Sequence, residues 1–441
     1  MGRQTLESDS CKKLTTLTGF LPEKFSHQRN CLCFGDVERQ PVAMTLPLPR
    51  PMHAPMRQHW ALDAELVFLN HGSFGACPKP ILALQSSLRQ QMEASPVQFL
   101  WRHLESRLHP VRQTLGGFVG ARPSDLVFVT NATCAVNAVV RSWPLRRGDA
   151  VLTTNLDYNA CRNVLTESTR RAGAKVIVAQ IPFPVGKPDE VVEAVLRAVT
   201  PRTRYAMIDH VTSASALVLP IARIVRELSA RGIETLVDGA HAPGMLPLNL
   251  NALRPAWYCG NLHKWVCAPK GSAFLWARED CQGTLQPAVI SHGNNSPRHG
   301  FSSFQDRFDW AGTFDPSAWL CVAEVIEWLG KLLPGGWPAV RRHNHALACQ
   351  ARRLLCAGLE VEAPCPVSML GSMATIPLPE RFQNPSWSST VAPEQIRLHE
   401  DFGIEVPFVS IGKRRYVRIS AHLHNHPAEF TFLAESLKTL N

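Results

Sequence analysis

The chain has 441 residues, more than a typical single domain of roughly 100–200 residues, so one large hydrophobic core or two cores are expected. Its 45% hydrophobic and 19% charged residues exclude a disordered chain. The sequence has no run of about 18 apolar residues, so no membrane span is predicted. Lys and Arg (46) outnumber Asp and Glu (36), but they are dispersed and no RNA-binding or zinc-finger signature accompanies them. The composition predicts a soluble, enzyme-sized protein that binds neither nucleic acid nor a membrane.

Residues 1–56 lack sustained periodicity and end in the Pro-rich stretch 47–51, which predicts a disordered N-terminal extension. The extension lacks the apolar stretch of a secretory signal, and it holds acidic residues that a transit peptide avoids. A start codon assigned too far upstream is an alternative, because Met44, Met52 and Met56 precede the first regular segment.

From about residue 64, short apolar segments alternate with segments of helical spacing. Strands are predicted at 65–69, 126–129, 150–153, 175–179, 205–208 and 233–237. Helices are predicted at 80–93, 99–118, 132–143, 160–172, 190–199 and 221–230. This alternation predicts a large α/β domain over residues 57–315, with a parallel sheet covered by helices on both faces.

The pattern changes after about residue 316. Long helical patterns and short strands are predicted at 316–332, 337–355, 369–376, 393–401, 404–407, 416–420 and from 427 onward. They predict a smaller α+β domain over residues 316–441.

The 13 cysteines are an odd number in a long chain, which fits a reducing compartment and predicts a cytoplasmic location. No C-x-x-C pair is present, so no metal site is predicted, and most cysteines are expected in the core. His422 and His424 have an i, i+2 spacing but no acidic residue close by, so a structural role is predicted for them.

The strand predicted at 233–237 is followed by Asp238, and His241 comes three residues later. In open α/β sheets, ligands bind beyond the carboxyl ends of the strands. An aspartate there can hold a buried cation or a protonated ring nitrogen. The alternative is a helix cap on the next turn.

Lys264 lies between Leu262 and Trp265, in an apolar setting where a solvated surface charge is not expected. Burial disfavours the ammonium form and lowers the pKa of a lysine, and a neutral amine is what a Schiff base requires. The alternative is a lysine whose stem covers an apolar patch while its amine reaches water.

The sequences at 237–241 (Val-Asp-Gly-Ala-His) and 260–265 (Gly-Asn-Leu-His-Lys-Trp) resemble the class V aminotransferase superfamily of fold-type I enzymes, which uses pyridoxal 5'-phosphate. Asn-His-Gly-Ser-Phe-Gly at 70–75 is similar to the isopenicillin N epimerase-like branch. The resemblance covers about residues 64–440. It implies a mostly parallel seven-stranded sheet covered by helices, followed by a smaller α+β domain.

The resemblance implies a role for each residue of the two central motifs. Lys264 forms the internal aldimine and moves the α-proton, and Asp238 pairs with the pyridinium nitrogen. His241 approaches the phenolic oxygen of the ring. Asn261 and His263 contact the phosphate.

Three further residues are expected at the cofactor. Ala132 and Thr133 open a helix after a strand, where free N–H groups suit a phosphate, although a simple helix cap would look the same. Tyr158, in a strand-to-helix loop, resembles the aromatic residue that stacks on the cofactor; the alternative is a surface tyrosine. Thr313 resembles the residue that reaches the phosphate of the neighbouring subunit, which implies a homodimer with shared active sites.

Arg418 lies between apolar neighbours on a predicted strand, and a bidentate arginine suits a substrate α-carboxylate. Asn70, His71 and His210 are also expected to bind the substrate. The second acid that an epimerase needs could be His71, Tyr158 or His210.

The leading hypothesis is a pyridoxal phosphate enzyme that acts on the α-carbon of an amino acid, with epimerase, racemase or aminotransferase chemistry. The alternative is a cysteine-type C–S lyase or desulfurase that works by β-elimination. Cys349, Cys356 and Cys365 occupy the approximate region of a desulfurase's nucleophile, but none lies in the expected Ser/Gly-rich loop. A non-catalytic relative that only binds a partner is disfavoured because Lys264 and Asp238 are both present.

Overall fold

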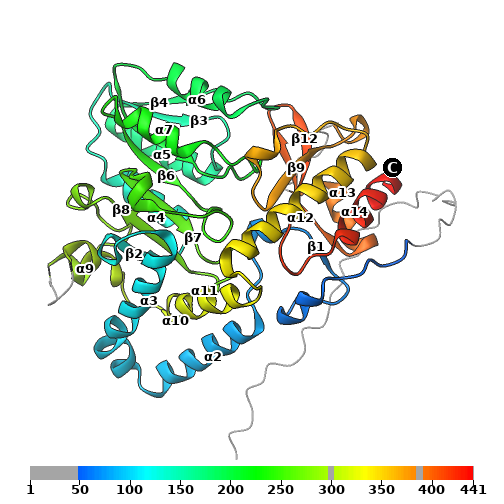
Figure 1. Cartoon of the computed structure of the whole chain (residues 1–441). Helices are drawn as coiled ribbons and strands as arrows, with labels where there is room; N and C mark the ends of the chain where they lie inside the picture. The colour runs from blue at the N-terminus through cyan, green and yellow to red at the C-terminus, as the bar shows by residue number, and fades with distance from the viewer. Residues whose placement is uncertain (1–47, 296–301, 384–390, 441) are drawn as a thin grey trace, which may run out of the picture. The chain divides into compact units, whose positions relative to one another are not determined.

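A computed structural model of the protein describes residues 48–295, 302–383 and 391–440, which belong to one structural unit (Figure 1). Most of the extension predicted over residues 1–56 lies outside the described residues. Its last part is described and contacts the C-terminal elements: Arg50 Nη1 donates to Phe402 O at 2.6 Å, and His53 Nδ1 lies 2.5 Å from Glu429 Oε1.

A seven-stranded sheet with strand order β2-β8-β7-β6-β5-β3-β4 forms the centre of this unit. The strands are β2 (Leu126–Val129), β3 (Ala150–Thr154), β4 (Lys175–Ala179), β5 (Thr203–Asp209), β6 (Glu234–Asp238), β7 (Trp257–Asn261) and β8 (Ala273–Ala277). β8 runs antiparallel to β2 and β7, and the other neighbouring strands are parallel. The predicted, mostly parallel α/β sheet is confirmed.

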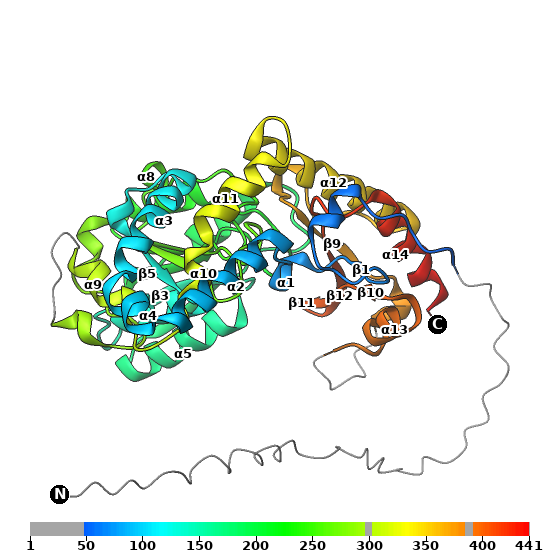
Figure 2. The same ribbon diagram turned by 90° about the horizontal axis from the view of Figure 1, so that it is seen from below.

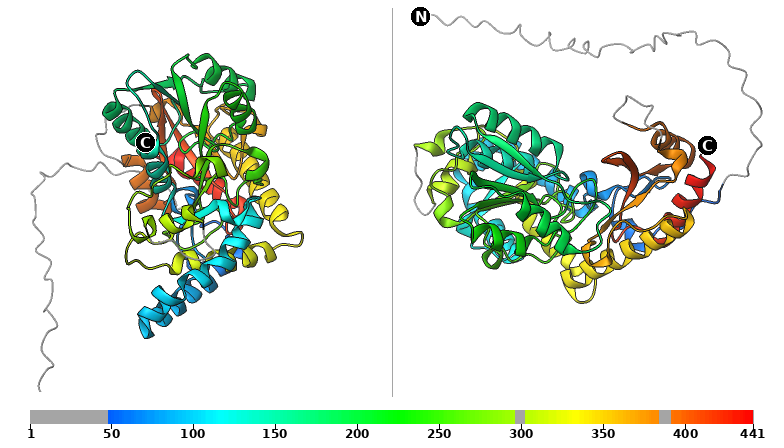
Figure 3. Two further views of the ribbon diagram at one scale, coloured as in Figure 1. Left: turned by 90° about the vertical axis from the view of Figure 1, so that its left-hand side faces the viewer. Right: turned by 90° about the horizontal axis from the view of Figure 1, so that it is seen from above.

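Helices cover both faces of this sheet (Figure 3). Successive strand residues point to opposite faces: Leu126 and Phe128 enter one core, and Val127 and Val129 enter the other. One face packs against α4 (Ala132–Ser142) and α5 (Asn159–Ala172). The other packs against α3 (Leu104–Val119), α6 (Pro188–Arg197), α7 (Ile221–Ser229) and α11 (Val322–Lys331). Both faces are therefore apolar, and polar groups gather at the strand ends.

A second, three-stranded antiparallel sheet of order β11-β12-β9 follows in the sequence. It contains β9 (Met373–Pro377), β11 (Phe408–Ile411) and β12 (Arg414–Ser420), and it is accompanied by α12 (Gly336–Gly358), α13 (Pro393–Phe402) and α14 (Pro427–Thr439). The short strand β1 (Val67–Phe68) pairs with β10 (Ile404–Glu405), so a segment from the first part of the described chain joins the C-terminal elements (Figure 2). The domain boundary at residues 315 and 316 stays a prediction.

The remaining helices are α1 (His71–Phe74), α2 (Lys79–Ala94), α8 (Leu250–Leu253), α9 (Ser303–Asp309) and α10 (Ser317–Leu320). The helix predicted over 316–332 is divided at Cys321, between α10 and α11. The backbone N–H of Cys321 donates to both Ser317 O and Trp319 O. In the described ranges, no helix has both the length and the apolar content to cross a membrane. All ten described cysteines are free and eight are buried, so the core role predicted for most of them is confirmed there.

Candidate active site

A cavity of about 380 Å³ lies at the carboxyl ends of the parallel strands. Asp209, Asp238 and Asn261, the last residues of β5, β6 and β7, all line it. Nine of the predicted site residues line it: Ala132, Thr133, Tyr158, Asp238, His241, Asn261, His263, Lys264 and Arg418. The cavity therefore joins residues from the sheet, from the start of α4 and from β12.

Lys264 and His241 face each other in this cavity, with Lys264 Nζ 3.0 Å from His241 Nε2. Burial, and after it the positive charge of the nearby Arg418, lower the pKa of Lys264 to about 7. Burial and the charge of Lys264 also hold the pKa of His241 well below its usual value, and Trp265 Nε1 donates to its Nδ1 at 3.5 Å. At neutral pH the cavity thus offers an amine that is partly unprotonated, next to a neutral imidazole.

This state of Lys264 can be tested in cofactor-free protein by acylating its amine and quantifying the Lys264 peptide by mass spectrometry. The acylation rate should rise with pH and reach half its maximum near pH 7, because only the neutral amine reacts and its fraction grows as the pH passes the lowered pKa. A midpoint near about 10.4, the value of a free lysine, would contradict this expectation.

Asp238 is 4% exposed and accepts three hydrogen bonds at the end of β6. The donors are Ala240 N at 3.0 Å, Cys161 Sγ at 3.2 Å and Cys259 Sγ at 3.8 Å. The helix-cap alternative is wrong, because the next helix, α8, begins only at Leu250. Its carboxylate is instead held at the cavity, where it can pair with a cationic ring nitrogen.

The amino end of α4 also opens on the cavity, which gives an anion the positive end of a helix. Asn131 caps this helix by accepting from Cys134 N at 2.9 Å. The amide of Ala132 is not free, because it donates to Asn261 Oδ1 at 2.8 Å. Ala132 and Asn261, both expected to bind phosphate, therefore bind each other. This bond does not involve Thr133, which lines the cavity and stays a candidate to bind the phosphate.

His263 is the other residue expected at the phosphate. Its Nδ1 lies 2.9 Å from Ser272 O, so this nitrogen carries a proton and donates. Burial lowers the pKa of His263 to about 4, so the ring is neutral near pH 7 and its Nε2 can only accept. It can donate to a phosphate only when protonated, a state that the negative charge of a phosphate would favour.

Arg418 is 4% exposed and reaches the cavity from β12. It donates to Ser213 O and to Ser73 Oγ, both at 2.8 Å, and more weakly to Asn70 Oδ1 at 3.4 Å. Burial lowers its pKa to about 10. Within the described ranges Arg418 has no ion pair, so a buried cation faces the cavity without a carboxylate partner.

The other predicted site residues lie differently. Tyr158 lines the cavity, as expected for a residue that stacks on the cofactor, and it is also 48% exposed, as expected for a surface tyrosine. Asn70 does not line the cavity and donates to Glu405 Oε1 at 3.0 Å. Thr313 is exposed between α9 and α10 and does not line the cavity either. Their roles stay predictions.

Two predicted histidines lie behind the cavity wall. His71 is 0% exposed, with Nε2 3.1 Å from Lys264 O and Nδ1 3.1 Å from His424 Nε2. His210 Nδ1 lies 2.9 Å from Tyr258 Oη. Burial lowers the pKa of His71 to about 3 and that of His210 to about 4. Neither line the cavity, so their geometry supports positioning of neighbours rather than contact with a substrate.

His71, His422 and His424 bring ring nitrogens within 4.8 Å of one another. The rings of His71 and His422 stack at 4.3 Å with only 15° between their planes. Burial holds the pKa values of all three histidines below the usual value, so the rings pack as neutral imidazoles.

Sequence reasoning missed several residues that line the cavity, among them Ser73, Asp209 and Ser213. Ser73 lies inside the motif at 70–75, and Asp209 ends a strand just as Asp238 does. The same strand-end signal that identified Asp238 could therefore have identified Asp209. No sequence pattern points to Ser213, because its place in the site depends on the hydrogen bonds that it accepts from the distant Arg418.

The residues of the cavity fit pyridoxal phosphate: they provide an amine of lowered pKa, a held carboxylate and a helix amino end.

The family model for aminotransferase class-V matches residues 81–431. Isopenicillin N epimerase of Amycolatopsis lactamdurans is 36% identical over 399 residues, covering 87% of this chain and 98% of that one. Probable L-cysteine desulfhydrase, chloroplastic, of Arabidopsis thaliana is 30% identical, covering 86% and 83%. A solved cysteine desulfurase from Thermococcus onnurineus NA1 superposes with a TM-score of 0.72 at 19% identity, covering 89% and 99%, which shows a common fold.

Proposed function

Because the chain belongs to the aminotransferase class-V family of pyridoxal phosphate-dependent enzymes, we propose that it acts on the α-carbon of an amino acid or an amino-acid-containing compound. The proposed reaction is epimerisation or racemisation, with transamination as the nearest variant. The observation that carries the proposal is that the low-pKa amine of Lys264 and the unpaired cation of Arg418 face one cavity. An amine that moves an α-proton and a cation that holds an α-carboxylate are the two groups this chemistry requires.

When bound, pyridoxal phosphate supplies an electron sink for the negative charge that develops at the α-carbon. We assign Asp238 to its ring nitrogen, His241 to its phenolic oxygen, Tyr158 to its face and Thr133 to its phosphate. Asn261 holds the amide of Ala132 and so fixes the start of α4, and His263 joins the phosphate group when protonated.

Inversion at the α-carbon needs a second proton donor on the side away from Lys264. Among His71, Tyr158 and His210, only Tyr158 lines the cavity. Tyr158 is therefore the candidate that the geometry favours, and its 48% exposure lets it exchange its proton with solvent.

The second candidate function is C–S bond cleavage by β-elimination, which the relatives named L-cysteine desulfhydrase favour. No cysteine is among the described residues that line the cavity. Cys365 and Cys349 are buried and engaged elsewhere: Arg352 Nη1 lies 3.7 Å from Cys365 Sγ, and Cys349 Sγ lies 3.6 Å from His345 Nε2. Elimination without a persulfide-carrying cysteine is thus the form of this alternative that we retain.

The deciding experiment incubates the holoenzyme with a panel of amino acids and amino-acid-containing compounds in deuterated water and follows α-deuterium incorporation, chirality and sulfide. Epimerisation predicts deuterium at the α-carbon together with inversion and no sulfide. Sulfide release would favour the lyase, and a new keto acid would favour transamination. Absence of α-hydrogen exchange across the panel would contradict the proposal.

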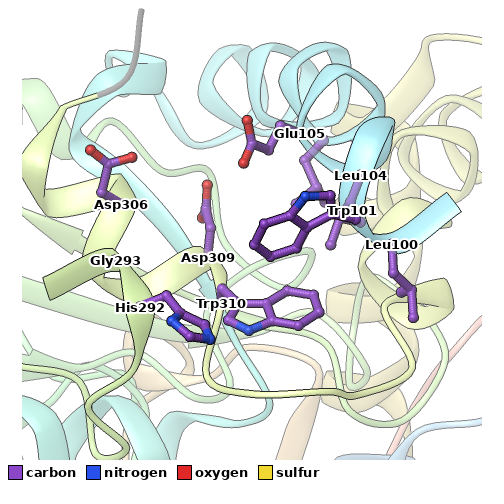
Figure 4. A pocket seen from close by; sticks show the side chains of 10 residues that line it. Leu100, Trp101, Leu104, Glu105, His292, Gly293, Asp306, Asp309 and Trp310 are labelled. Atoms are coloured by element: carbon purple, nitrogen blue, oxygen red, sulfur yellow. The ribbon is translucent and has the colours of Figure 1, made fainter. Parts of the chain in front are cut away.

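We also propose that the enzyme is a cytoplasmic homodimer. The cysteines in the described ranges are free, which fits a reducing compartment. The dimer proposal rests on the family and on a cavity of about 290 Å³, shown in Figure 4, where Trp101 stands over Trp310. Trp101 is 68% exposed, and Ile290, close to the cavity residue His292, is 63% exposed. Large exposed aromatic and aliphatic side chains are typical of a surface covered by a partner.

Replacing Trp101 by glutamate should therefore shift the protein from dimer to monomer, because it places a charge where an apolar contact is expected. Light scattering coupled to size-exclusion chromatography measures the mass of wild type and variant. Ile396→Glu, which changes an exposed isoleucine on α13, is the matched control and should stay dimeric. A monomeric wild type would contradict the dimer and leave the proposed chemistry standing.

A further inference from the structure

Asp209 is a second carboxyl group beside Asp238. It ends β5, and its register partner on the adjacent parallel strand β6 is Asp238. Register partners project their side chains from the same face of a sheet. Both residues line the cavity, and they are 3% and 4% exposed. Two buried carboxyl groups therefore stand next to each other at the carboxyl edge of the sheet.

The two groups differ in their hydrogen bonds. Asp238 accepts from Ala240 N and from the thiols of Cys161 and Cys259. Asp209 Oδ1 is buried and has no hydrogen-bond partner. Within the described part of the chain, Asp209 has no ion pair either. A carboxylate is stabilised by donors, and Asp238 alone has them, so the negative charge belongs on Asp238.

The charged groups around Asp209 lead to the same assignment. Asp157, before α5, is held by Arg162, whose Nε and Nη2 donate to it at 2.8 and 2.7 Å. Burial first, then the negative charges of Asp238 and Asp157, raise the pKa of Asp209 well above its usual value. The positive charges of Lys264 and Arg162 oppose that rise without reversing it. Cys161 and Cys259 remain neutral thiols, because burial raises their pKa values too.

We propose that Asp209 is a protonated carboxylic acid on the wall of the cavity and donates a hydrogen bond to the bound cofactor, beside the carboxylate of Asp238. The protonated state is a property of the protein itself. Only the acceptor, pyridoxal phosphate, rests on the proposed function. Asp209 is thus a further cofactor-binding residue. Because Asp209 is protonated, Asp238 carries the single negative charge of the pair.

The pH dependence of stability follows from this assignment. A carboxyl group whose pKa is higher in the folded than in the unfolded chain stabilises the fold at low pH. That contribution is lost as the pH rises toward the folded pKa. Asp209→Asn keeps a neutral side chain of the same shape at every pH. Relative to wild type, the variant should therefore gain thermal stability as the pH is raised above about 4, where the unfolded group ionises and the folded group stays protonated.

The direct test is infrared spectroscopy of the holoenzyme at neutral pH, where a protonated carboxyl group has a C=O band separate from carboxylate bands. Wild type should show this band, Asp209→Asn should lack it, and Asp149→Asn, which changes a carboxylate before β3, should retain it. Spectra of wild type and Asp209→Asn that do not differ in this band would overturn the proposal.

The hydrogen bond is tested by rebinding pyridoxal phosphate to the cofactor-free protein. Asp209→Ala should bind it roughly 2- to 12-fold more weakly than wild type, the effect of one neutral hydrogen bond. Asp209→Asn should bind it almost as wild type does, because its amide can still donate. Equal affinity of wild type and Asp209→Ala would overturn the hydrogen bond. A wild type that binds no cofactor while its carboxyl band persists would instead contradict the proposed function.

Discussion

Replacing Lys264 by alanine should remove the visible absorption of the holoenzyme and lower the rate of α-hydrogen exchange by roughly 10²- to 10⁴-fold or more. The reason is the position and the state of its amine. Lys264 Nζ faces the cavity, and a pKa of about 7 leaves a large neutral fraction at physiological pH. Absorption spectroscopy and mass spectrometry after borohydride reduction would measure the loss of covalent attachment.

Lys270→Ala is the matched control for this prediction. Lys270 lies in the same loop, is exposed, and donates to Gly75 O at 2.6 Å without lining the cavity. The control should keep the absorption band and most of the activity. Covalently bound cofactor in Lys264→Ala would assign the attachment to another residue and contradict the proposed site.

Replacing Arg418 by lysine should cost about 2–5 kcal/mol in kcat/KM, a roughly 30- to 4,000-fold loss, because a buried charge pair with the substrate carboxylate is truncated. Lysine keeps the charge but cannot present two parallel donors to a carboxylate. It also gives up at least one of the bonds to Ser73 Oγ and Ser213 O that hold the guanidinium in place. Steady-state kinetics with the amino acid that exchanges fastest would measure the loss.

Two comparisons make this prediction specific to carboxylate binding. Arg414→Lys changes an exposed arginine on the same strand and should leave kcat/KM within about twofold of wild type. Wild type should discriminate against the decarboxylated form of the substrate more strongly than Arg418→Lys does. Equal discrimination by both proteins would place the carboxylate elsewhere.

Local patterns were sufficient for most of the large sheet. The strands predicted at 126–129 and 175–179 match β2 and β4 residue for residue, because each is a short apolar run bounded by turn residues, which is typical of a strand. β7 and β8 were not predicted from periodicity. β7 ends in Gly260 and Asn261, which weaken an apolar pattern, and the antiparallel β8 follows without the helix that marks the other crossovers.

The sequence by itself determined the cofactor class and the residues that carry it. Asp238, His241 and Lys264 lie within one short stretch, and two consecutive strands bring them together. Their spacing can therefore be recognised in the sequence alone. Tertiary structure alone decided the rest of the site. Arg418 and Ser73 meet across 345 residues, and Asp209 becomes the neighbour of Asp238 only when β5 and β6 pair in register. Burial decided the chemistry of each group, because a pKa depends on the charges and water that surround a side chain and not on its position in the chain.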